Sequence, residues 1–112
     1  MIIKRADEAQ QYEAAGHVGM VPLKYHPKEE SPIMALSLGL SKFQPGGTTG
    51  YDKRSVEMIY FVLEGELTLR TEEGETKMHK YDSVHFMIDE YREMRNDSSE
   101  EASMLVFASF KK

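Results

Sequence analysis

The sequence contains no cysteine among its 112 residues. Disulfide bonds, thiolate nucleophiles and zinc sites built from cysteine are therefore excluded. Long apolar runs are missing too, because the longest, Met58 to Leu63, is far shorter than the roughly 20 residues that cross a bilayer. The first residues become charged at Lys4, which does not match the apolar core of a signal peptide. We therefore expect a cytoplasmic protein that does not insert into a membrane.

An excess of positive charge is also missing. The 14 lysine and arginine residues are outnumbered by 19 aspartate and glutamate residues, which gives a formal net charge of −5. Nucleic acids and anionic membranes are bound by basic surfaces that displace counterions, so we expect neither as a partner. With 40% hydrophobic and 29% charged residues, the composition is typical of a globular protein. At this length, residues 1–112 are expected to form a single domain.

The N-terminal segment, residues 1–32, differs from the rest of the chain. Asp7 is suited to cap a short helix, with Gln10 as its capping partner and Gly16 as its end. Prolines then follow at positions 22, 27 and 32. Because proline cannot donate a hydrogen bond to a sheet, we expect this part to be irregular or to form an edge strand.

From residue 33 to residue 110 the sequence predicts strands only. Apolar and polar residues alternate with a period of two over 34–41, which indicates a half-buried strand. The continuous apolar run at 58–63 indicates a strand that is covered on both faces. Further strands are expected at 67–70, 75–78, 83–88, 94–96 and 102–110, with Glu-Gly turns at 64–65 and 73–74. Short strands at such spacing predict a β-sandwich or barrel.

The segment from Phe43 to Glu66, FQPGGTTGYDKRSVEMIYFVLEGE, resembles the first motif of the cupin superfamily. It shares the Pro-Gly-Gly turn, the polar run, the apolar strand and the tight Glu-Gly turn of that motif. In cupins the motif carries a His-x-His pair and a glutamate that bind a metal. Counting back from Gly65, Met58 stands where the motif has its glutamate. The two histidines correspond to Asp52 and Arg54.

The segment from Tyr81 to Ser99, YDSVHFMIDEYREMRNDSS, resembles the second cupin motif in its strand–loop–strand order. With the closing asparagine of that motif placed on Asn96, Arg92 stands where the third metal-binding histidine is expected. The resemblance covers residues 33–110. It implies an all-β fold, a cupin-like double-stranded β-helix or jelly-roll barrel, preceded by a short irregular N-terminal segment.

The matched positions predict that this chain does not bind a cupin metal. Cupins typically hold Fe, Mn, Ni or Zn with three imidazoles and one carboxylate. The resemblance places Asp52, Arg54, Met58 and Arg92 at those positions. A guanidinium group stays protonated and has no lone pair for a metal, and two of them would repel a divalent cation. We therefore expect the metal-binding histidines to be replaced, with no metal and no cofactor.

The same residues predict a positively charged pocket that binds an anion in place of a metal cation. If Arg54 and Arg92 point into the barrel, they form a cationic floor that binds carboxylates or phosphates through paired hydrogen bonds. The expected ligand-binding residues are Tyr51, Asp52, Arg54, Met58, Tyr60 and Arg92. The alternative is that ion pairs close the barrel mouth. One pair would join Asp52 to Arg54, and the other would join Glu57 to Arg92.

Two functions are consistent with such a pocket. The first is metal-independent binding of a small molecule, a small organic anion, in bacterial-type metabolism. The second is a metal-free isomerase, cyclase or epimerase, which the resemblance permits because some cupins work without a metal. Its acid–base candidates are Tyr51, Glu57 and His17, the last because imidazole titrates near neutral pH. The missing histidines disfavour a metal-dependent dioxygenase or decarboxylase. The sequence does not choose between binding and catalysis.

The strand at 58–63 also predicts an interface. Its alternate residues Ile59, Phe61 and Leu63 should face outward, opposite the row that faces the core. An apolar row of this kind is not expected to stay in contact with water. Either the N-terminal segment or a second copy of the chain would cover it. Single cupin domains are commonly homodimers, so we expect a homodimer.

Overall fold

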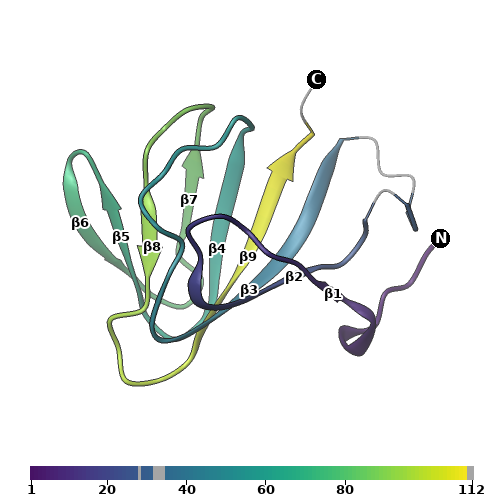
Figure 1. The fold of residues 1–112 in the computed structure, drawn as a ribbon, viewed down its shortest axis with the longest axis horizontal. Coiled ribbons are helices and arrows are strands. Elements are labelled where there is room, and N and C mark those ends of the chain that lie inside the picture. Colours follow the sequence, from purple (N-terminus) through teal and green to yellow (C-terminus); the bar gives the residue numbers. More distant parts are fainter. Residues whose placement is uncertain (28, 32–34, 111–112) are drawn as a thin grey trace.

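The computed structural model describes residues 1–27, 29–31 and 35–110, and it is built almost entirely of strands (Figure 1). A single turn of 3-10 helix, η1 (Ala6–Glu8), precedes β1 (Gln10–Gln11), β2 (Val18–Lys24), β3 (Leu36–Thr48), β4 (Met58–Glu64), β5 (Leu67–Thr71), β6 (Gly74–Met78), β7 (Ser83–Phe86), β8 (Glu93–Arg95) and β9 (Ala102–Ser109). Each strand pairs with its neighbours in the antiparallel sense. The expected all-β fold is confirmed.

The strands form a sheet that folds over on itself into a jelly-roll barrel. Their order is β6-β5-β8-β3-β9-β4-β7, and β2 joins β1 to β3 outside this path. Within the described residues β6 and β7 do not pair, so the barrel has an open seam between these two strands. Figure 1 shows two facing layers, with β5, β6 and β8 in one and β4, β7 and β9 in the other.

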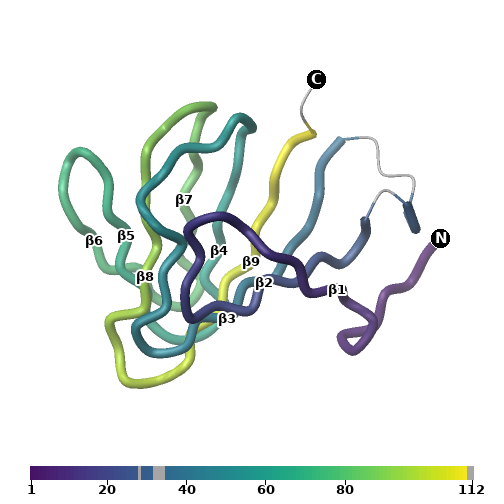
Figure 2. The backbone as a smooth tube through the Cα atoms, viewed as in Figure 1, coloured from purple at the N-terminus to yellow at the C-terminus, as the bar shows by residue number. Residues whose placement is uncertain are grey.

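Strand β3 is shared by both layers. It pairs with β9 along its first half, and at its end Thr48 pairs with Arg95 of β8. The Pro-Gly-Gly sequence that predicted a turn therefore lies inside a long strand, and the backbone tube bends there (Figure 2). Gly47 has to be glycine, because a Cβ atom at this position would lie 2.3 Å from the carbonyl oxygen of Gly19. The close approach of β2 thus fixes the corner of the barrel.

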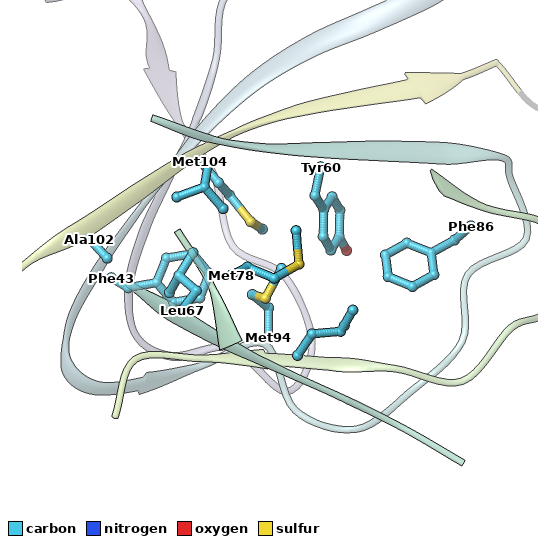
Figure 3. Packing of buried hydrophobic residues seen from close by; sticks show 10 residues of the cluster. Phe43, Tyr60, Leu67, Met78, Phe86, Met94, Ala102 and Met104 are labelled. Atoms are coloured by element: carbon cyan, nitrogen blue, oxygen red, sulfur yellow. The ribbon is translucent and has the colours of Figure 1, made fainter. Parts of the chain in front are cut away.

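The hydrophobic core fills the space between the layers (Figure 3). Its buried members are Phe43, Tyr60, Val62, Leu67, Leu69, Met78, Phe86, Met94, Ala102 and Met104. Tyr60 and Phe86 face one another in the picture, edge to face, with ring centroids 5.2 Å apart. The alternation predicted for β4 is confirmed, since Tyr60 and Val62 are buried while Ile59 is 42% exposed.

The other predicted strands are present with small shifts at their ends. Strand β7 ends at Phe86 rather than at Ile88, because the backbone N–H of Met87 donates to the Glu90 carboxylate at 2.9 Å and the chain turns. The Glu64–Gly65 turn is confirmed, and Gly65 has a φ of +82°. The start of the strand expected at residues 33 and 34 lies outside the described residues.

The helix predicted from Asp7 to Gly16 is wrong. Only the single turn of η1 forms, where the Glu8 carboxylate accepts a hydrogen bond from the backbone N–H of Arg5 at 2.8 Å. The chain is then extended, and β1 pairs with β2. Sheet pairing therefore outweighs the capping pattern of Asp7, Gln10 and Gly16 that suggested a helix. The described part of the chain has no helix that is long and apolar enough to cross a membrane.

Asn96, the residue that matches the second cupin motif, has a structural role. It is fully buried, and its amide donates to the carbonyl oxygens of Phe43 at 3.1 Å and Glu100 at 2.7 Å. Its side-chain oxygen accepts hydrogen bonds from the backbone and hydroxyl of Ser98. Asn96→Ala would leave these buried groups unpaired, so we expect the free energy of unfolding in urea to fall by about 2 kcal/mol or more. A change within about 0.5 kcal/mol would contradict this role.

Candidate functional site

Arg92 is a buried cation at the centre of the candidate site. It precedes β8, and only 3% of its surface is exposed. Two backbone hydrogen bonds join it to Asp52. The Arg92 N–H donates to the Asp52 carbonyl oxygen at 2.9 Å, and the Asp52 N–H donates to the Arg92 carbonyl oxygen at 3.1 Å. These bonds connect the loop after β3 with the loop after β7. The fold thereby brings together residues from the two segments that resemble the cupin motifs.

Neutral groups surround the Arg92 guanidinium. Its Nη2 atom lies 2.8 Å from the Met58 sulfur and 3.3 Å from the Tyr60 hydroxyl oxygen. Its Nη1 atom donates to the carbonyl oxygen of Glu90 at 3.1 Å, and its central carbon lies 4.7 Å from the centre of the Phe86 ring. Among the described residues no carboxylate forms an ion pair with Arg92. Two of the predicted ligand-binding residues, Met58 and Tyr60, therefore meet around a third, Arg92, which has no counter-ion among the described residues.

A second cation, Arg54, connects this site to the N-terminal segment. It forms the predicted ion pair with Asp52, at 3.4 Å, on the rim of the barrel. Burial lowers the pKa of the His17 imidazole, and the Arg54 charge lowers it further. Burial raises the pKa of the Tyr12 phenol, Tyr60 raises it further and Arg54 opposes this. The Arg54 charge thus acts on both His17 and Tyr12, and the lowered pKa of His17 favours its neutral imidazole.

Tyr51 lies apart from this group. Its ring stacks on Tyr91 with centroids 5.6 Å apart, and the Arg70 guanidinium lies 4.3 Å from its centre. It is 37% exposed, and within the described residues it makes no hydrogen bond or ring contact with Arg92. The structure therefore places Tyr51 in a separate stack on the barrel rim.

Glu57 turns away from the barrel interior. Its Oε2 atom lies 2.5 Å from Nε2 of His85, and both side chains are about half exposed. The residue precedes Met58 by one position, so the alternation of β4 directs it to the outer face, where His85 also lies as the cross-strand partner of Ile59. The Glu57–Arg92 ion pair that the sequence offered as an alternative does not form.

The sequence analysis missed two features of the site. The first is Tyr12, whose position depends on the pairing of β1 with β2 and is not marked by any local pattern. The second is a cavity of about 420 Å³ between the β5–β6 turn and β7, which we call the seam cavity. Its lining includes Phe86, Tyr91 and the carboxylic acids Glu72, Glu73, Asp89 and Glu90. These residues come from two separate segments, 69–73 and 84–91, and only the fold brings them together.

The residues at the matched metal positions do not fit a metal ion. The Arg92 guanidinium occupies the space beside Met58 and Tyr60, and it offers protons where a metal needs lone pairs. The carboxylate of Asp52 points to the rim and is about half exposed. Within the described ranges, no three His, Cys, Asp or Glu side chains form a group that could hold a metal.

Family membership follows from the sequence and agrees with this fold. Residues 39–108 match the Cupin_2 family, described as a cupin domain, and the chain belongs to that family. A relative from Mycobacterium tuberculosis, named Beta-D-galactosidase Rv1717, is 32% identical over 106 residues. This match covers 95% of the present chain and 91% of the relative. The replacement of the metal-binding histidines, which rests on the motif alignment, stays a prediction.

Solved structures with the same architecture include enzymes of different kinds. The polyketide cyclase RemF from Streptomyces resistomycificus superimposes with a TM-score of 0.87 at 15% identity, covering 99% of this chain and 80% of that chain. A sugar phosphate isomerase of the cupin superfamily from Silicibacter pomeroyi gives a TM-score of 0.80 at 17% identity, covering 98% and 76%. At these identities the likeness establishes the shared fold, and function has to be argued from the site.

The lowered pKa of His17 predicts a pH effect on stability. The folded state disfavours the imidazolium, so the unfolded chain binds more protons as the pH falls. The contribution of His17 to stability is therefore complete above the ordinary imidazole pKa of about 6.5 and is lost as the pH falls below it. In His17→Gln, unfolding measured in urea should depend less steeply on pH over this range. Equal slopes in both proteins would contradict the assignment.

Proposed function

We propose that this cupin binds a small organic anion inside its barrel without a metal. The observation that supports this most directly is Arg92, which is buried and has no counter-ion among the described residues. The Tyr60 hydroxyl beside it offers a further hydrogen bond to an oxygen-rich ligand. Arg54 on the rim adds positive potential where such a ligand would enter. A carboxylate or phosphate matches the paired donors of a guanidinium group.

The free energy of a buried charge favours this interpretation. Removing an ion from water costs several kcal/mol unless an opposite charge or good hydrogen bonds compensate for it. Arg92 is partly compensated by a thioether, a phenol, a carbonyl and two rings. These groups leave its charge unmatched. An anionic ligand would supply the missing negative charge. Compensating the buried charge of Arg92 would then add to the binding free energy of the ligand.

Thermal unfolding with a panel of anions tests the proposal. D-galacturonate, citrate and inorganic phosphate serve as probes, with uncharged D-galactose as the matched neutral control. At least one anion should raise the melting temperature in a concentration-dependent way, because a ligand that binds only the folded state stabilises it. Treatment with a chelator should leave the shift unchanged. A shift that requires added metal, or none with any anion, would contradict the proposal.

A second candidate is metal-free catalysis on a sugar, which the name of the M. tuberculosis relative favours. Glycoside hydrolysis usually needs two carboxylic acids, about 5–10 Å apart, on either side of the scissile bond. Among the described residues, the side-chain hydrogen bonds of Arg92 go to Glu90's carbonyl oxygen, Met58 and Tyr60 and not to a carboxylate, whereas the seam cavity carries four carboxylic acids. The isomerase, cyclase or epimerase alternative would instead use the neutral imidazole of His17 as its base.

Release of nitrophenol from nitrophenyl β-D-galactoside separates these possibilities. If the protein is a galactosidase of the seam cavity, Glu73→Gln or Glu90→Gln should remove turnover while Arg92→Met retains it. Glu75→Gln is the matched control, because Glu75 is exposed on β6 and does not line the cavity. Absence of turnover in the unaltered protein would leave binding as the supported function.

We also propose that the protein is a homodimer formed through the outer face of β3, β9 and β4. This outer face carries Leu36, Leu38, Leu40, Ile59, Phe61, Leu105 and Phe107, which lie in cross-strand register. Tyr12 of the N-terminal segment instead lines a cavity with Met58 and Val106, on the inner side. The segment is therefore directed toward the barrel interior, and a second copy of the chain is left to cover the outer face.

A further inference from the structure

The seam cavity, of about 420 Å³, has an apolar floor. The floor consists of Leu69 from β5 and of Val84 and Phe86 from β7, two strands that belong to opposite layers of the barrel (Figure 1). Leu69 and Phe86 are buried members of the hydrophobic core. Tyr91, from the loop before β8, is 42% exposed and adds a second aromatic ring to the lining. A cavity of this size and composition is suited to a small organic molecule.

The rim of the same cavity carries negative charge. Two carboxylic acids lie in the β5–β6 turn and two in the loop after β7, and all four are exposed: Glu72, Glu73, Asp89 and Glu90. Among the described residues none of these carboxylates forms an ion pair, and only that of Glu90 accepts a hydrogen bond, from a backbone N–H. A hollow lined by charges of one sign focuses the electric field and concentrates ions of the opposite sign. The seam cavity therefore attracts cations.

No cationic side chain offsets this charge within the described lining. The lining contains no lysine or arginine, and Nε2 of its single histidine, His85, lies 2.5 Å from the Glu57 carboxylate. A protonated His85 is thus balanced by Glu57, and a neutral His85 adds no charge. Lys53 does not line the cavity, but its Nζ atom lies 5.7 Å from the centre of the Tyr91 ring. That contact shows that the ring is placed where a cation can approach it.

The spacing of the four acids selects the kind of cation. In the part of the chain that the structure describes, His, Asp and Glu side chains do not gather in threes that could hold a metal ion. The carboxylates therefore do not converge on one point, as Ca²⁺ or Mg²⁺ requires. They stand in two pairs on the two sides of the seam, and the apolar floor lies between the pairs. This arrangement matches a longer cation that carries its charges at both ends.

We propose that the seam cavity binds an organic amine of the aliphatic diamine class. The two ammonium groups pair with carboxylates of the β5–β6 turn and of the loop after β7, and the methylene groups lie on the apolar floor. The Tyr91 ring adds a cation–π contact. This site is separate from Arg92, which does not line the cavity, so the inference does not depend on the proposed binding of an anion. It gives the four acids a role in binding rather than in hydrolysis.

Titration with 1,4-diaminobutane tests the inference. The neutral control is 1,4-butanediol, which has the same chain length, and sodium chloride keeps the ionic strength constant. Isothermal titration should give saturable binding of the diamine and none of the diol. In nitrogen-15-labelled protein, the diamine should shift the backbone amide resonances of residues 71–73 and 84–91, which line the cavity. A higher salt concentration should weaken the binding, because the charges are exposed.

Two double variants separate the cavity from the overall charge of the protein. Glu73→Gln with Asp89→Asn removes one carboxylate from each side of the seam. It should weaken diamine binding about fivefold, since each exposed charge pair is worth about twofold in affinity. The matched control, Asp7→Asn with Glu100→Gln, removes the same charge from exposed positions outside the cavity and should leave the affinity unchanged. All four positions are exposed, so both double variants should keep the melting temperature of the unaltered protein.

A pair of substitutions at Tyr91 tests the aromatic contact. Tyr91→Leu should weaken diamine binding about threefold, the effect of one exposed cation–π contact. Tyr91→Phe keeps the ring and should retain the affinity. Equal affinities of these two variants would remove Tyr91 from the site and would contradict the proposed contact.

The other outcomes decide the inference as a whole. Equal binding of the diamine and the diol would overturn it, as would equal losses in the two double variants, because the attraction would then not belong to the cavity. Shifts of the same amides by D-galactose, with none by the diamine, would assign the cavity to a sugar instead. Absence of diamine binding would also overturn the inference. The anion panel tests Arg92 with ligands of opposite charge, so its result stands apart from all of these.

Discussion

Arg92→Met is expected to abolish anion binding without unfolding the protein. Methionine fills most of the space of the arginine side chain and removes the charge. The paired hydrogen bonds between a guanidinium and a carboxylate are worth about 3 kcal/mol, so the affinity for anions should fall by about a hundredfold or more. In the absence of ligand the stability should change by about 1 kcal/mol or less, because an uncompensated buried cation contributes little net stability.

Isothermal titration and urea unfolding of the same samples measure both effects. Arg5→Met is the matched control, since Arg5 is exposed near the N-terminus. Loss of binding with retained stability would support Arg92 as a ligand-binding residue. A large loss of stability with unchanged anion affinity would show instead that Arg92 is a structural residue, held by Tyr60, Phe86 and Glu90 for the sake of the fold.

Ile59→Asp is expected to convert the homodimer into a monomer. Ile59 lies on the outer face beside Phe107 and is 42% exposed, so the fold of one chain tolerates a polar residue there. In a two-fold dimer the carboxylate would be buried at the interface in both copies. Burying unpaired charges costs several kcal/mol, which exceeds what a small interface can compensate.

Light scattering coupled to size-exclusion chromatography measures the change. The unaltered protein should have twice the chain mass of 12.8 kDa, and Ile59→Asp should have the single mass. Ile88→Asp is the control, because Ile88 is also exposed but lies in the loop after β7. A single-chain mass for the unaltered protein at micromolar concentration would overturn the proposed homodimer.

Most of the barrel could be predicted from the sequence because its strands carry strong local patterns. The apolar run of β4 and the Glu-Gly turn at Gly65 predict a strand and its end, and the structure reproduces both. The prediction that β4 is covered on both faces is wrong for the single chain, because Ile59 is 42% exposed. The prediction of an N-terminal helix was wrong because it rested on residues at the helix ends alone, and β2 was available as a pairing partner for β1. The Pro-Gly-Gly corner was misread as a turn, since nothing local reveals that the close approach of Gly19 bends a continuing strand.

The sequence predicted the site residues correctly only where the cupin motif and the alternation of side chains along a strand direct the same residue into the barrel. Met58, Tyr60 and Arg92 meet because β4 and the loop before β8 both follow the cupin order. Glu57 lies apart from them because neighbouring residues of a strand point to opposite faces, so that it contacts His85 on the outer face. Tyr51 lies apart because its ring stacks on Tyr91 at the rim of the barrel. Tyr12 depends on pairing between distant segments, which no spacing in a single sequence encodes.

At the open seam, β6 and β7 each have one edge that pairs with no other strand in the described part of the chain. Such edges can recruit strands from other molecules and grow into fibrils. On β6 the exposed Glu75 and Lys77 place charges along this edge, which opposes the docking of a further strand. Self-association through backbone hydrogen bonding is thereby discouraged, and the chain can carry a broad apolar outer surface without polymerising.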